Sequence, residues 1–473
     1  MNKRVLSHII LFVLIFGCDN IKDEKQVPFE KLSSDITGIN FSNIITPNIE
    51  TSENLFDYDY FYNGSGVGIA DINNDGLKDV LFTANQQMNR LFLNKGNLTF
   101  EDITELSNIN TKNKEWSSGV TFADVNNDGW LDIYISQGGP YDSNSRKNLL
   151  LINNQDLTFT EKAEEYGLDD NGISTQSAFF DFDKDGDLDC VVMNENEFFG
   201  YDPISFFKKY ENKSVLMENS SHLYEQKDGK FINITEKAGL LSPTFGLGLC
   251  ISDINNDNWP DIYIANDYYV KDAMYINNQD GTFTNQIKKS TKQISFYGMG
   301  VDIEDINNDN LSDIFVLDMA SSDHVRSKTL MASMNTSNFD LITNKLDQHY
   351  QYMFNSLQLN LGNDKYHNIS HQLNIAKTDW SWAGLIFDYN LDGNEDIFVT
   401  NGYRKYGSDN DSRIRINETR KEYNNKVPIE MKKRLYDELP SEKLPNLLYK
   451  NEGDLTFKEV GNNSALNDPS FSN

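Results

Sequence analysis

Basic residues, histidine and cysteine are scarce in this 473-residue sequence. Lys and Arg number 42 against 72 Asp and Glu, which gives a formal net charge of −30. Proteins that bind nucleic acid through a basic face need the opposite balance, so we expect no nucleic-acid partner. The 6 histidines form no HExxH motif, and the chain has no G-x-S-x-G motif. We therefore predict no catalytic residues and no enzyme.

The three cysteines are Cys18, Cys190 and Cys250, and no CxxC pair or Cys/His cluster suggests zinc. Cys190 and Cys250 lie in apolar runs, which predicts buried free thiols rather than a disulfide or a nucleophile.

The first 18 residues have the pattern of an export signal, with a basic start before a short apolar run over residues 5–16. The run is too short to predict a transmembrane helix. Residues 14–18, Leu-Ile-Phe-Gly-Cys, resemble a bacterial lipobox, which implies cleavage before Cys18 and a lipid on its sulfur. Residues 19–28 then form a polar tether, which resembles the export tags of surface lipoproteins in Bacteroidetes-type bacteria. We therefore expect a protein secreted across the inner membrane and lipid-anchored in the outer membrane.

One nine-residue pattern is abundant. It begins at Asp71 and recurs with first residues Asp124, Asp181, Asp253, Asp305 and Asp388. Every copy has Asp at positions 1, 5 and 9, and Asn or Asp at position 3. Position 6 is Gly in four copies and Asn in two (Asn258, Asn310), residue types that tolerate a left-handed backbone. Side-chain oxygens at alternate positions around a sharp turn suit a hard cation such as Ca²⁺.

Short apolar segments surround each copy in a fixed order. In the first unit a Gly-rich strand at 66–70 precedes the loop, and strands at 80–83, 90–94 and 98–104 follow it. Four short strands with turn signals form one antiparallel sheet. The first aspartates recur 52 to 83 residues apart, a period typical of a β-propeller. The sequence predicts an all-β fold over residues 29–473, with six to seven four-stranded blades and small residues at the crowded centre.

Other loop families do not fit the residues that follow the pattern. An EF-hand needs a carboxylate at position 12, which is apolar in all six copies. Dockerin-like repeats place a helix after the loop, and thrombospondin-type repeats bring cysteines. The pattern instead resembles the integrin-α-type loop of FG-GAP and VCBS repeats, which lies between two strands of a propeller blade.

This resemblance implies up to six structural Ca²⁺ ions, bound by side chains at positions 1, 3, 5 and 9 and by the backbone carbonyl of position 7. The implied ligands are Asp71, Asn73, Asp75, Leu77, Asp79, Asp124, Asn126, Asp128, Trp130, Asp132, Asp181, Asp183, Asp185, Asp187, Asp189, Asp253, Asn255, Asp257, Trp259, Asp261, Asp305, Asn307, Asp309, Leu311, Asp313, Asp388, Asn390, Asp392, Asn394 and Asp396. Two alternatives stay open. The loops are metal-free Asx-rich turns, or the fourth and fifth are vacant because Asn258 and Asn310 replace Gly and Pro260 occupies position 8.

Three insertions, residues 194–226, 318–356 and 401–445, each follow the second strand of a unit, so we expect all three on one face. Residues 429–439 are helix-like. Aromatic residues in and beside the insertions are candidates for binding a partner: Phe199, Tyr201, Tyr350, Tyr352, Trp380, Trp382 and Tyr403. Such residues either stack on sugars or hold a peptide, or they fold the insertions onto the disc.

Residues 318–324, 328–331 and 379–382 resemble segments of secreted VCBS/FG-GAP proteins from Bacteroidetes. In these proteins the propeller is often followed by an ASPIC/UnbV module, as in cartilage acidic protein. The resemblance predicts a binding or adhesion module at the cell envelope, with a glycan or protein ligand. Two alternatives are an envelope polysaccharide-processing enzyme and a structural subunit of an outer-membrane assembly.

The two ends of the sequence bear on how the ring closes. Residues 467–473 look like the approach to another lead-in strand, so either the sequence is truncated or the ring closes with fewer blades. Residues 29–41 resemble an outer strand, which suggests that the N- and C-terminal strands share one closing blade.

Overall fold

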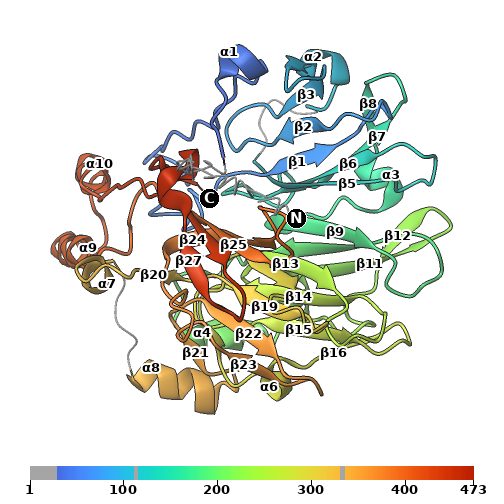
Figure 1. Ribbon diagram of the computed structural model, residues 1–473. Helices are drawn as coiled ribbons and strands as arrows, with labels where there is room; N and C mark the ends of the chain where they lie inside the picture. Colours follow the sequence, from blue (N-terminus) through green and yellow to red (C-terminus); the bar gives the residue numbers. More distant parts are fainter. Residues whose placement is uncertain (1–28, 111–115, 331–335, 473) are drawn as a thin grey trace, which may run out of the picture.

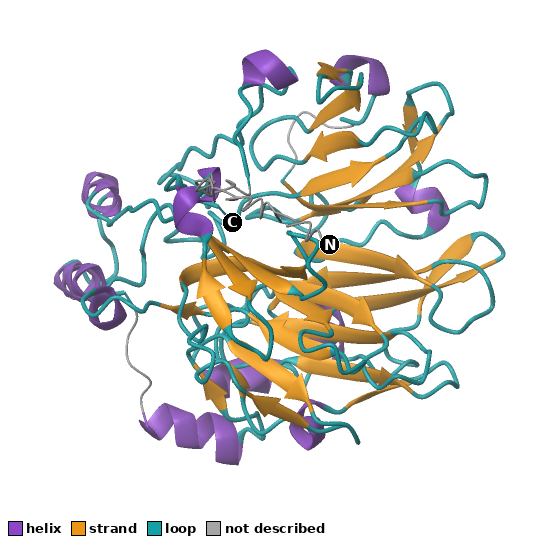
Figure 2. Ribbon diagram, in the orientation of Figure 1, coloured by secondary structure: helices purple, strands orange, loops and turns teal. Residues whose placement is uncertain are grey.

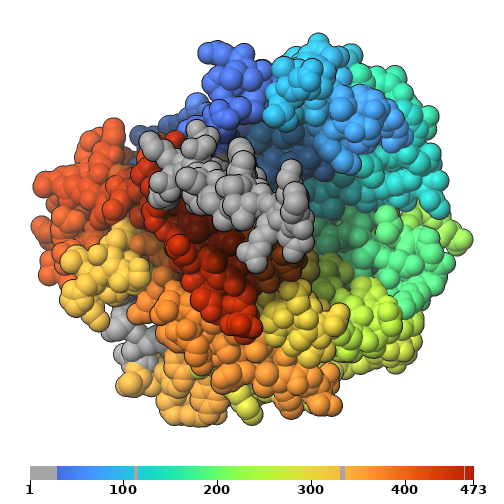
Figure 3. Space-filling model, in the orientation of Figure 1, coloured from blue at the N-terminus to red at the C-terminus, as the bar shows by residue number. Residues whose placement is uncertain are grey.

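The structure, a computed structural model, describes residues 29–110, 116–330 and 336–472. The predicted signal segment, Cys18 and the tether at 19–28 lie outside the described residues. Six antiparallel sheets follow one another around the molecule, from blue at the top to red at the left (Figure 1, Figure 3). Each contains four strands in chain order from the inside outward, and the sixth gains one extra strand. The predicted all-β, propeller-like fold is confirmed.

The strands of each sheet have the following bounds. The first three sheets are β1 (Val67–Ala70), β2 (Asp79–Phe82), β3 (Arg90–Asn94) and β4 (Phe100–Asp102); β5 (Ser117–Ala123), β6 (Asp132–Gln137), β7 (Leu149–Asn153) and β8 (Phe159–Glu161); and β9 (Ser174–Phe180), β10 (Asp189–Asn194), β11 (His222–Lys227) and β12 (Lys230–Asn233). The last three are β13 (Gly246–Ser252), β14 (Asp261–Asn266), β15 (Ala273–Asn277) and β16 (Phe283–Asn285); β18 (Val301–Glu304), β19 (Asp313–Val316), β22 (Ser356–Asn360) and β23 (Tyr366–Asn368); and β24 (Asp379–Phe387), β25 (Asp396–Asn401), β26 (Leu447–Asn451) and β27 (Phe457–Glu459), with β20 (Met319–Ala320) beside β24.

Alternating apolar side chains hold neighbouring sheets together. Side chains point to opposite faces along a strand, and Leu81 of β2 thereby packs with Ile133 and Leu149 of the second sheet. Five buried clusters of this kind each join two successive sheets. Cys190 is a buried free thiol in one of them, as predicted, whereas the free Cys250 is only half-buried.

Small residues are required where the innermost strands meet. A Cβ on Gly248 would lie 2.4 Å from the carbonyl oxygen of Met299, and one on Gly300 would lie 2.3 Å from that of Trp382. Both neighbours are backbone atoms of the next sheet, which cannot turn aside as a side chain does. The prediction that crowding at the centre selects glycine is confirmed.

Between the sixth and first sheets lies the N-terminal segment, residues 29–45, rather than a closing strand. Residues 29–41 contain the short helix α1 (Ser34–Thr37), so the predicted outer strand is wrong. The segment bonds locally and to both neighbours: Phe29 accepts from the Ala465 N–H, and Phe41 stacks on Phe82 at 5.1 Å. The likeness to outer strands reflects a shared apolar pattern. Within the described residues, the segment approaches β4 at Gly38 but forms no strand pairing.

The insertions carry most of the helices. The connection from β10 to β11 holds α4 (Pro203–Lys209) and α5 (Lys213–Glu218), so the predicted boundary at 226 falls inside β11. The second insertion holds β20, α7 (Arg326–Thr329), α8 (Thr336–Asp340), the π-helix η1 (Leu341–Lys345) and β21 (Gln351–Tyr352), which pairs with β17 (Ile294–Ser295). The third insertion holds two helices, α9 (Asn410–Glu422) and α10 (Ile429–Asp437). The helix predicted at 429–439 is α10, whereas α9 was not predicted. Short helices α2 (Thr104–Ser107), α3 (Ala163–Tyr166) and α6 (Ile287–Ser290) follow outer strands, and the 3-10 turns η2 (Gly461–Asn463) and η3 (Ala465–Asn467) follow β27.

All three insertions pack onto one end of the sheets. Helix α9 contacts α7 through the Asn410 side chain and the Lys328 carbonyl, 3.0 Å apart, and α7, α9 and α10 lie together in the ribbon views (Figure 1, Figure 2). The insertions join second to third strands, whereas the Asp loops join first to second strands. In an antiparallel sheet these two connections lie at opposite ends. Among the helices that the structure describes, none is both long and apolar enough to span a bilayer.

Candidate functional site

The six Asp loops share one backbone conformation. Position 4 has a left-handed backbone in every copy, with φ between 57° and 61°, and position 6 has φ between 67° and 100°. Asn258 and Asn310 adopt φ values of 68° and 67°, so Asn fills the place of Gly without changing the turn. The fourth and fifth loops therefore have the same backbone turn as the others.

Backbone N–H groups inside each loop point at the aspartates of positions 1 and 5. In the first loop the Asp75 and Gly76 N–H groups donate to the two Asp71 oxygens, at 3.1 and 2.8 Å. The Leu77 N–H donates to Asp75 Oδ1 at 2.8 Å. The position-3 side chain of Asn73 also donates to Asp75 Oδ2, at 3.0 Å. These hydrogen bonds hold the carboxylates of Asp71 and Asp75 close together.

The aspartate at position 9 ties each loop to the rest of its sheet. In the first loop, Asp79 accepts from the Ile72 N–H at 3.0 Å and from the Asn94 N–H at 2.8 Å. The same pair of bonds recurs in the other five loops, at Asp132, Asp189, Asp261, Asp313 and Asp396. The sequence analysis did not predict that the position-9 aspartate binds these backbone N–H groups, nor that the last residues of the third strand take part. A signal for the second feature is present in the sequence, because Asn ends the third strand in five of the six units.

Pro260 at position 8 is compatible with this arrangement. Only the carbonyl of position 8 is used, as acceptor for the side-chain amide of the third-strand residue. Asn277 Nδ2 donates to the Pro260 oxygen at 3.2 Å, just as Asn153 Nδ2 donates to the Leu131 oxygen at 3.1 Å. The missing N–H of proline therefore costs the loop nothing.

The third loop shows best that a hard cation fits. Asp181, Asp183 and Asp189 offer carboxylate oxygens within 4.8 Å of one another. Asp181 Oδ1 and Asp187 Oδ1 are buried and have no hydrogen-bond partner among the described residues. Burial, and then the negative charge of Asp185, raise the pKa of Asp187 to about 6. A buried acceptor without a donor is costly, and an oxygen-rich set of this kind suits Ca²⁺.

A pocket of about 450 Å³ lies at the insertion end of the sheets, and we call it the insertion pocket. Residues from all three insertions and from the segment 55–63 line it, as the common position of the insertions predicted. Trp380 and Tyr403 stack face to face in its wall, with ring centroids 4.5 Å apart and planes 2° apart. Trp382 also stacks on Tyr403, with ring centroids 5.7 Å apart. The wall is therefore a continuous aromatic stack, of which Trp380 and Tyr403 are buried and Trp382 is partly exposed.

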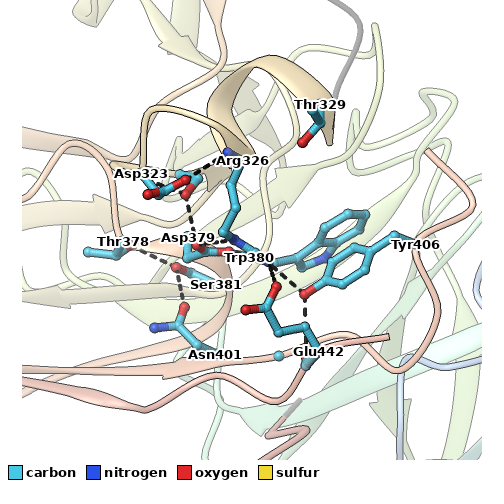
Figure 4. A network of polar contacts seen from close by, with 12 residues as sticks. Asp323, Arg326, Thr329, Thr378, Asp379, Trp380, Ser381, Asn401, Tyr406 and Glu442 are labelled. Atoms are coloured by element: carbon cyan, nitrogen blue, oxygen red, sulfur yellow. Dashed lines mark hydrogen bonds and ion pairs between the residues drawn. The ribbon is translucent and has the colours of Figure 1, made fainter. Parts of the chain in front are cut away.

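An ion-pair network fixes this wall from behind (Figure 4). The Arg326 guanidinium on α7 donates to both Asp379 oxygens, at 2.6 and 2.9 Å, and also binds Glu442 and the Tyr406 hydroxyl. Asp379 immediately precedes Trp380 and has a left-handed backbone, φ 81°. The network joins the second and third insertions to β24 and sets the direction in which Trp380 leaves the strand.

Tyrosine hydroxyls hold three acidic side chains at the pocket and at the central channel beneath it. Tyr268 donates to Asp59 at 2.8 Å, and Tyr60 donates to Asp267 at 3.1 Å; all four residues line the insertion pocket. Glu195, which lines the central channel, accepts from the Tyr58 hydroxyl at 2.9 Å. Burial raises the pKa of Asp267 to about 7 and that of Glu195 to about 8. Asp267 and Glu195 are therefore partly or largely protonated near neutral pH.

The predicted partner-binding residues do not form one surface. Trp380, Trp382 and Tyr403 line the insertion pocket, and Trp380 and Tyr403 are buried. Phe199 packs in an edge-on contact with Tyr58, 5.9 Å between centroids, while the half-exposed Tyr201 lines a neighbouring cavity. Tyr350 and Tyr352 both contact Phe339 at 6.1 and 5.5 Å. The pocket also contains residues that the sequence did not single out, among them Asp59, Asp267 and Arg413.

Two segments of the chain, residues 71–135 and 253–316, match the family model described as the FG-GAP-like repeat. Each matched segment begins at the first aspartate of a loop and spans two loops. None of the curated proteins compared with the chain matched it.

Solved structures similar to this chain have propeller-like folds. One is a lectin from Agrocybe aegerita that recognises non-reducing terminal N-acetylglucosamine; it is 14% identical, with 87% of this chain and 84% of the lectin covered and a TM-score of 0.42. The BBS1 N-terminal domain in complex with ARL6 is 8% identical over 70% of this chain and 74% of its own, with a TM-score of 0.36. The Vibrio cholerae biofilm matrix protein Bap1 is 13% identical over 55% of this chain and 35% of its own, with a TM-score of 0.32. At these scores the likenesses say nothing about what this chain binds.

The buried acids give a first test, at constant excess Ca²⁺. A carboxyl whose folded pKa is raised holds its proton more tightly in the folded state, so stability falls as pH rises from about 4.3, its unfolded value, to about 8 for Glu195. Glu195→Gln keeps a hydrogen-bonding group for Tyr58 but removes the titration. We expect the melting temperature of the wild type to fall between pH 5 and pH 8, and that of the variant to fall by less. Equal slopes in the two proteins would contradict the assignment.

Proposed function

We propose that this chain is a calcium-stabilised interaction module held at the bacterial cell envelope by an N-terminal lipid. The observation that supports an interaction role is the insertion pocket, to which three insertions far apart in the sequence contribute residues. A rigid ring of sheets presents these insertions on one end, as loop-borne sites are presented in many folds. The ligand is a glycan or a protein of the envelope.

The calcium part of the proposal rests on the loops. Each of the six loops contains at least three aspartates, which repel one another when no cation is present. The most direct support is the orphaned Asp181 Oδ1, together with the close carboxylate oxygens of Asp181, Asp183 and Asp189. Side chains at positions 1, 3, 5 and 9, with the carbonyl at position 7, would hold the ion. Its role is structural: a cation that binds only the folded state stabilises it by about 2.7 kcal/mol at a concentration 100 times its Kd.

Calcium removal tests this part. We expect Ca²⁺ to raise the melting temperature by several degrees and EGTA to reverse the rise. The double variant Asp71→Ala and Asp124→Ala removes one ligand from each of two loops, and its rise should be smaller. The matched control is Glu422→Ala with Glu430→Ala, which removes two exposed carboxylates outside the loops. If EGTA leaves the wild-type melting curve unmoved, the calcium part is wrong.

The envelope location rests on the lipobox-like residues 14–18 and on the resemblance to Bacteroidetes lipoproteins of the ASPIC/UnbV-associated type. A single acyl chain anchors weakly, whereas the several chains of a bacterial lipoprotein anchor stably. The acidic tether at 19–28 would then separate the ring from the bilayer.

Replacing the proposed lipid-bearing residue tests the location. With Cys18→Ser we expect the protein to move from the membrane fraction to the soluble fraction, because no thiol remains for the lipid. Cys250→Ser is a control for loss of a free thiol elsewhere. Fractionation followed by immunoblotting measures the outcome, and an unchanged membrane fraction in Cys18→Ser would contradict lipid anchoring at this residue.

One observation favours a second candidate, a glycan-processing enzyme. Asp59 and Asp267 line the same pocket, and glycoside hydrolases use a pair of carboxyl groups. The raised pKa of Asp267, about 7, would let it donate a proton near neutral pH.

An assay for new reducing ends on envelope oligosaccharides tests the enzyme hypothesis. If the hypothesis is right, Asp267→Asn should reduce product formation by a factor of about 100 or more. The control is Asp272→Asn, because Asp272 is a buried acid outside the pocket lining, and this variant should keep its activity. Absence of product from the wild type would leave the binding module as the function.

A further inference from the structure

The insertion pocket is bounded on one side by helix α9. Arg413, Ile416, Asn417 and Arg420 line the pocket, and their spacing places them on one face of the helix. This face presents two guanidinium groups and one amide. The helix begins at a well-formed cap, since the Asp409 side chain accepts from the Ser412 N–H at 2.8 Å. A capped helix of 13 residues holds these side chains at fixed spacing.

Arg413 and Arg420 differ from the other arginines of the described chain. The remaining six described arginines each bind a carboxylate or a carbonyl through the guanidinium: Arg90, Arg146, Arg326, Arg404, Arg415 and Arg434. Arg413 and Arg420 form no side-chain hydrogen bond or ion pair with any described residue. Both are exposed at the mouth of the pocket. In a chain of net charge −30 there is no shortage of carboxylates to pair with them.

One polar group of the aromatic wall, the Trp380 indole N–H, also lacks a partner among the described residues. Trp380 is 6% exposed. The Asn63 side-chain oxygen, which lines the same pocket, is also without one. A buried donor and a buried acceptor without hydrogen bonds reduce the stability of the folded state. A ligand with hydroxyl groups could bind both.

The pocket combines an aromatic surface, unpaired polar groups and guanidinium groups, and one class of ligand can bind all three. Trp382, at the end of the aromatic stack, stays partly exposed, and its flat, electron-rich ring attracts the polarised C–H groups of a sugar ring. The unpaired Trp380 N–H and Asn63 oxygen suit hydroxyl groups. Guanidinium groups bind carboxylates and other oxyanions through paired N–H bonds. The volume, about 450 Å³, lies within the range of small-molecule sites, about 300–1,000 Å³.

We propose that the insertion pocket binds an anionic saccharide, with a sugar ring against the exposed part of Trp382 and a carboxylate or sulfate group at Arg413 and Arg420. This proposal rests on the proposed interaction role and names the ligand class for it. Nucleotides also combine a ring with an anion. However, the dianionic phosphate of a mononucleotide would lie in a pocket that already contains Asp59 and Asp267, which disfavours it relative to a carboxylate or sulfate group, each of which carries a single negative charge.

Calorimetric titration of the full-length soluble protein, Cys18→Ser, in Ca²⁺ buffer tests the proposal. The probes are tri-galacturonate, its uncharged methyl ester, a sulfated carrageenan tetrasaccharide and AMP. We expect tri-galacturonate, the carrageenan or both to bind, and the methyl ester to bind at least about tenfold more weakly than the acid. Arg413→Gln and Arg420→Gln should each weaken binding of the acid by about tenfold or more, because each removes a charge-assisted hydrogen bond.

The matched control is Lys421→Gln, on the same helix but outside the pocket lining, which should change the affinity less than twofold. All three side chains are exposed, so the variants should fold, and their melting curves check this. Equal binding of acid and ester, loss of affinity in Lys421→Gln as large as in the arginine variants, binding of AMP alone, or no binding of any probe would each overturn the proposal.

A parallel pull-down with isolated envelope material separates this outcome from failure of the proposed function. Envelope retention without binding of any saccharide probe overturns the ligand class and leaves the interaction role standing. Loss of both overturns both.

Discussion

The position-9 aspartate of each loop is the contact on which the rest of the ring depends. Its two oxygens accept one N–H from the start of the loop and one from the end of the third strand, as Asp79 does with Ile72 and Asn94. A single buried carboxylate thereby fixes the turn between the first two strands and the register of the third. Each blade is too small to bury its own core, so it is stable only when its strands present a flat face to the next blade. Six copies of this bond set supply six such faces.

The tyrosine-rich segment before β1 performs a comparable task at the opposite end. Residues 53–62 place Tyr58, Tyr60 and Tyr62 between the insertions, and their hydroxyls reach Glu195, Asp267 and Tyr436. Each bond joins parts of the chain that are at least 137 residues apart. The insertions are thereby fixed to one another as well as to their own sheets, which explains how loops of such length shape a pocket.

Local repetition made the ring predictable, and the absence of repetition hid the pocket. The loops, the apolar strands after them and the glycine strands at the centre follow from spacing that recurs in every unit. Asn258 and Asn310 were doubtful only because the sequence does not show φ, which the structure gives as 68° and 67°. From the sequence, the position-9 aspartate was predicted only as a metal ligand. Its hydrogen bond from the Asn94 N–H joins it to a strand 15 residues later and leaves no local pattern in the sequence. The Asp59–Tyr403 contact, 344 residues apart, and the free Arg413 and Arg420 depend on tertiary packing that no spacing reveals.

The separation of the two ends also resolves an apparent conflict, since an anion would be repelled by a chain of net charge −30. The loops gather aspartates at one end of the sheets, and the pocket lies at the other. Strand β25, with 6 residues from Asp396 to Asn401, spans roughly 17 Å between them at 3.3 Å per residue. That distance is about twice the Debye length of roughly 8 Å at physiological ionic strength. The field at the pocket mouth is therefore governed by nearby groups, of which Arg413 and Arg420 carry unpaired charge and Asp267 is partly protonated at neutral pH because its pKa is about 7.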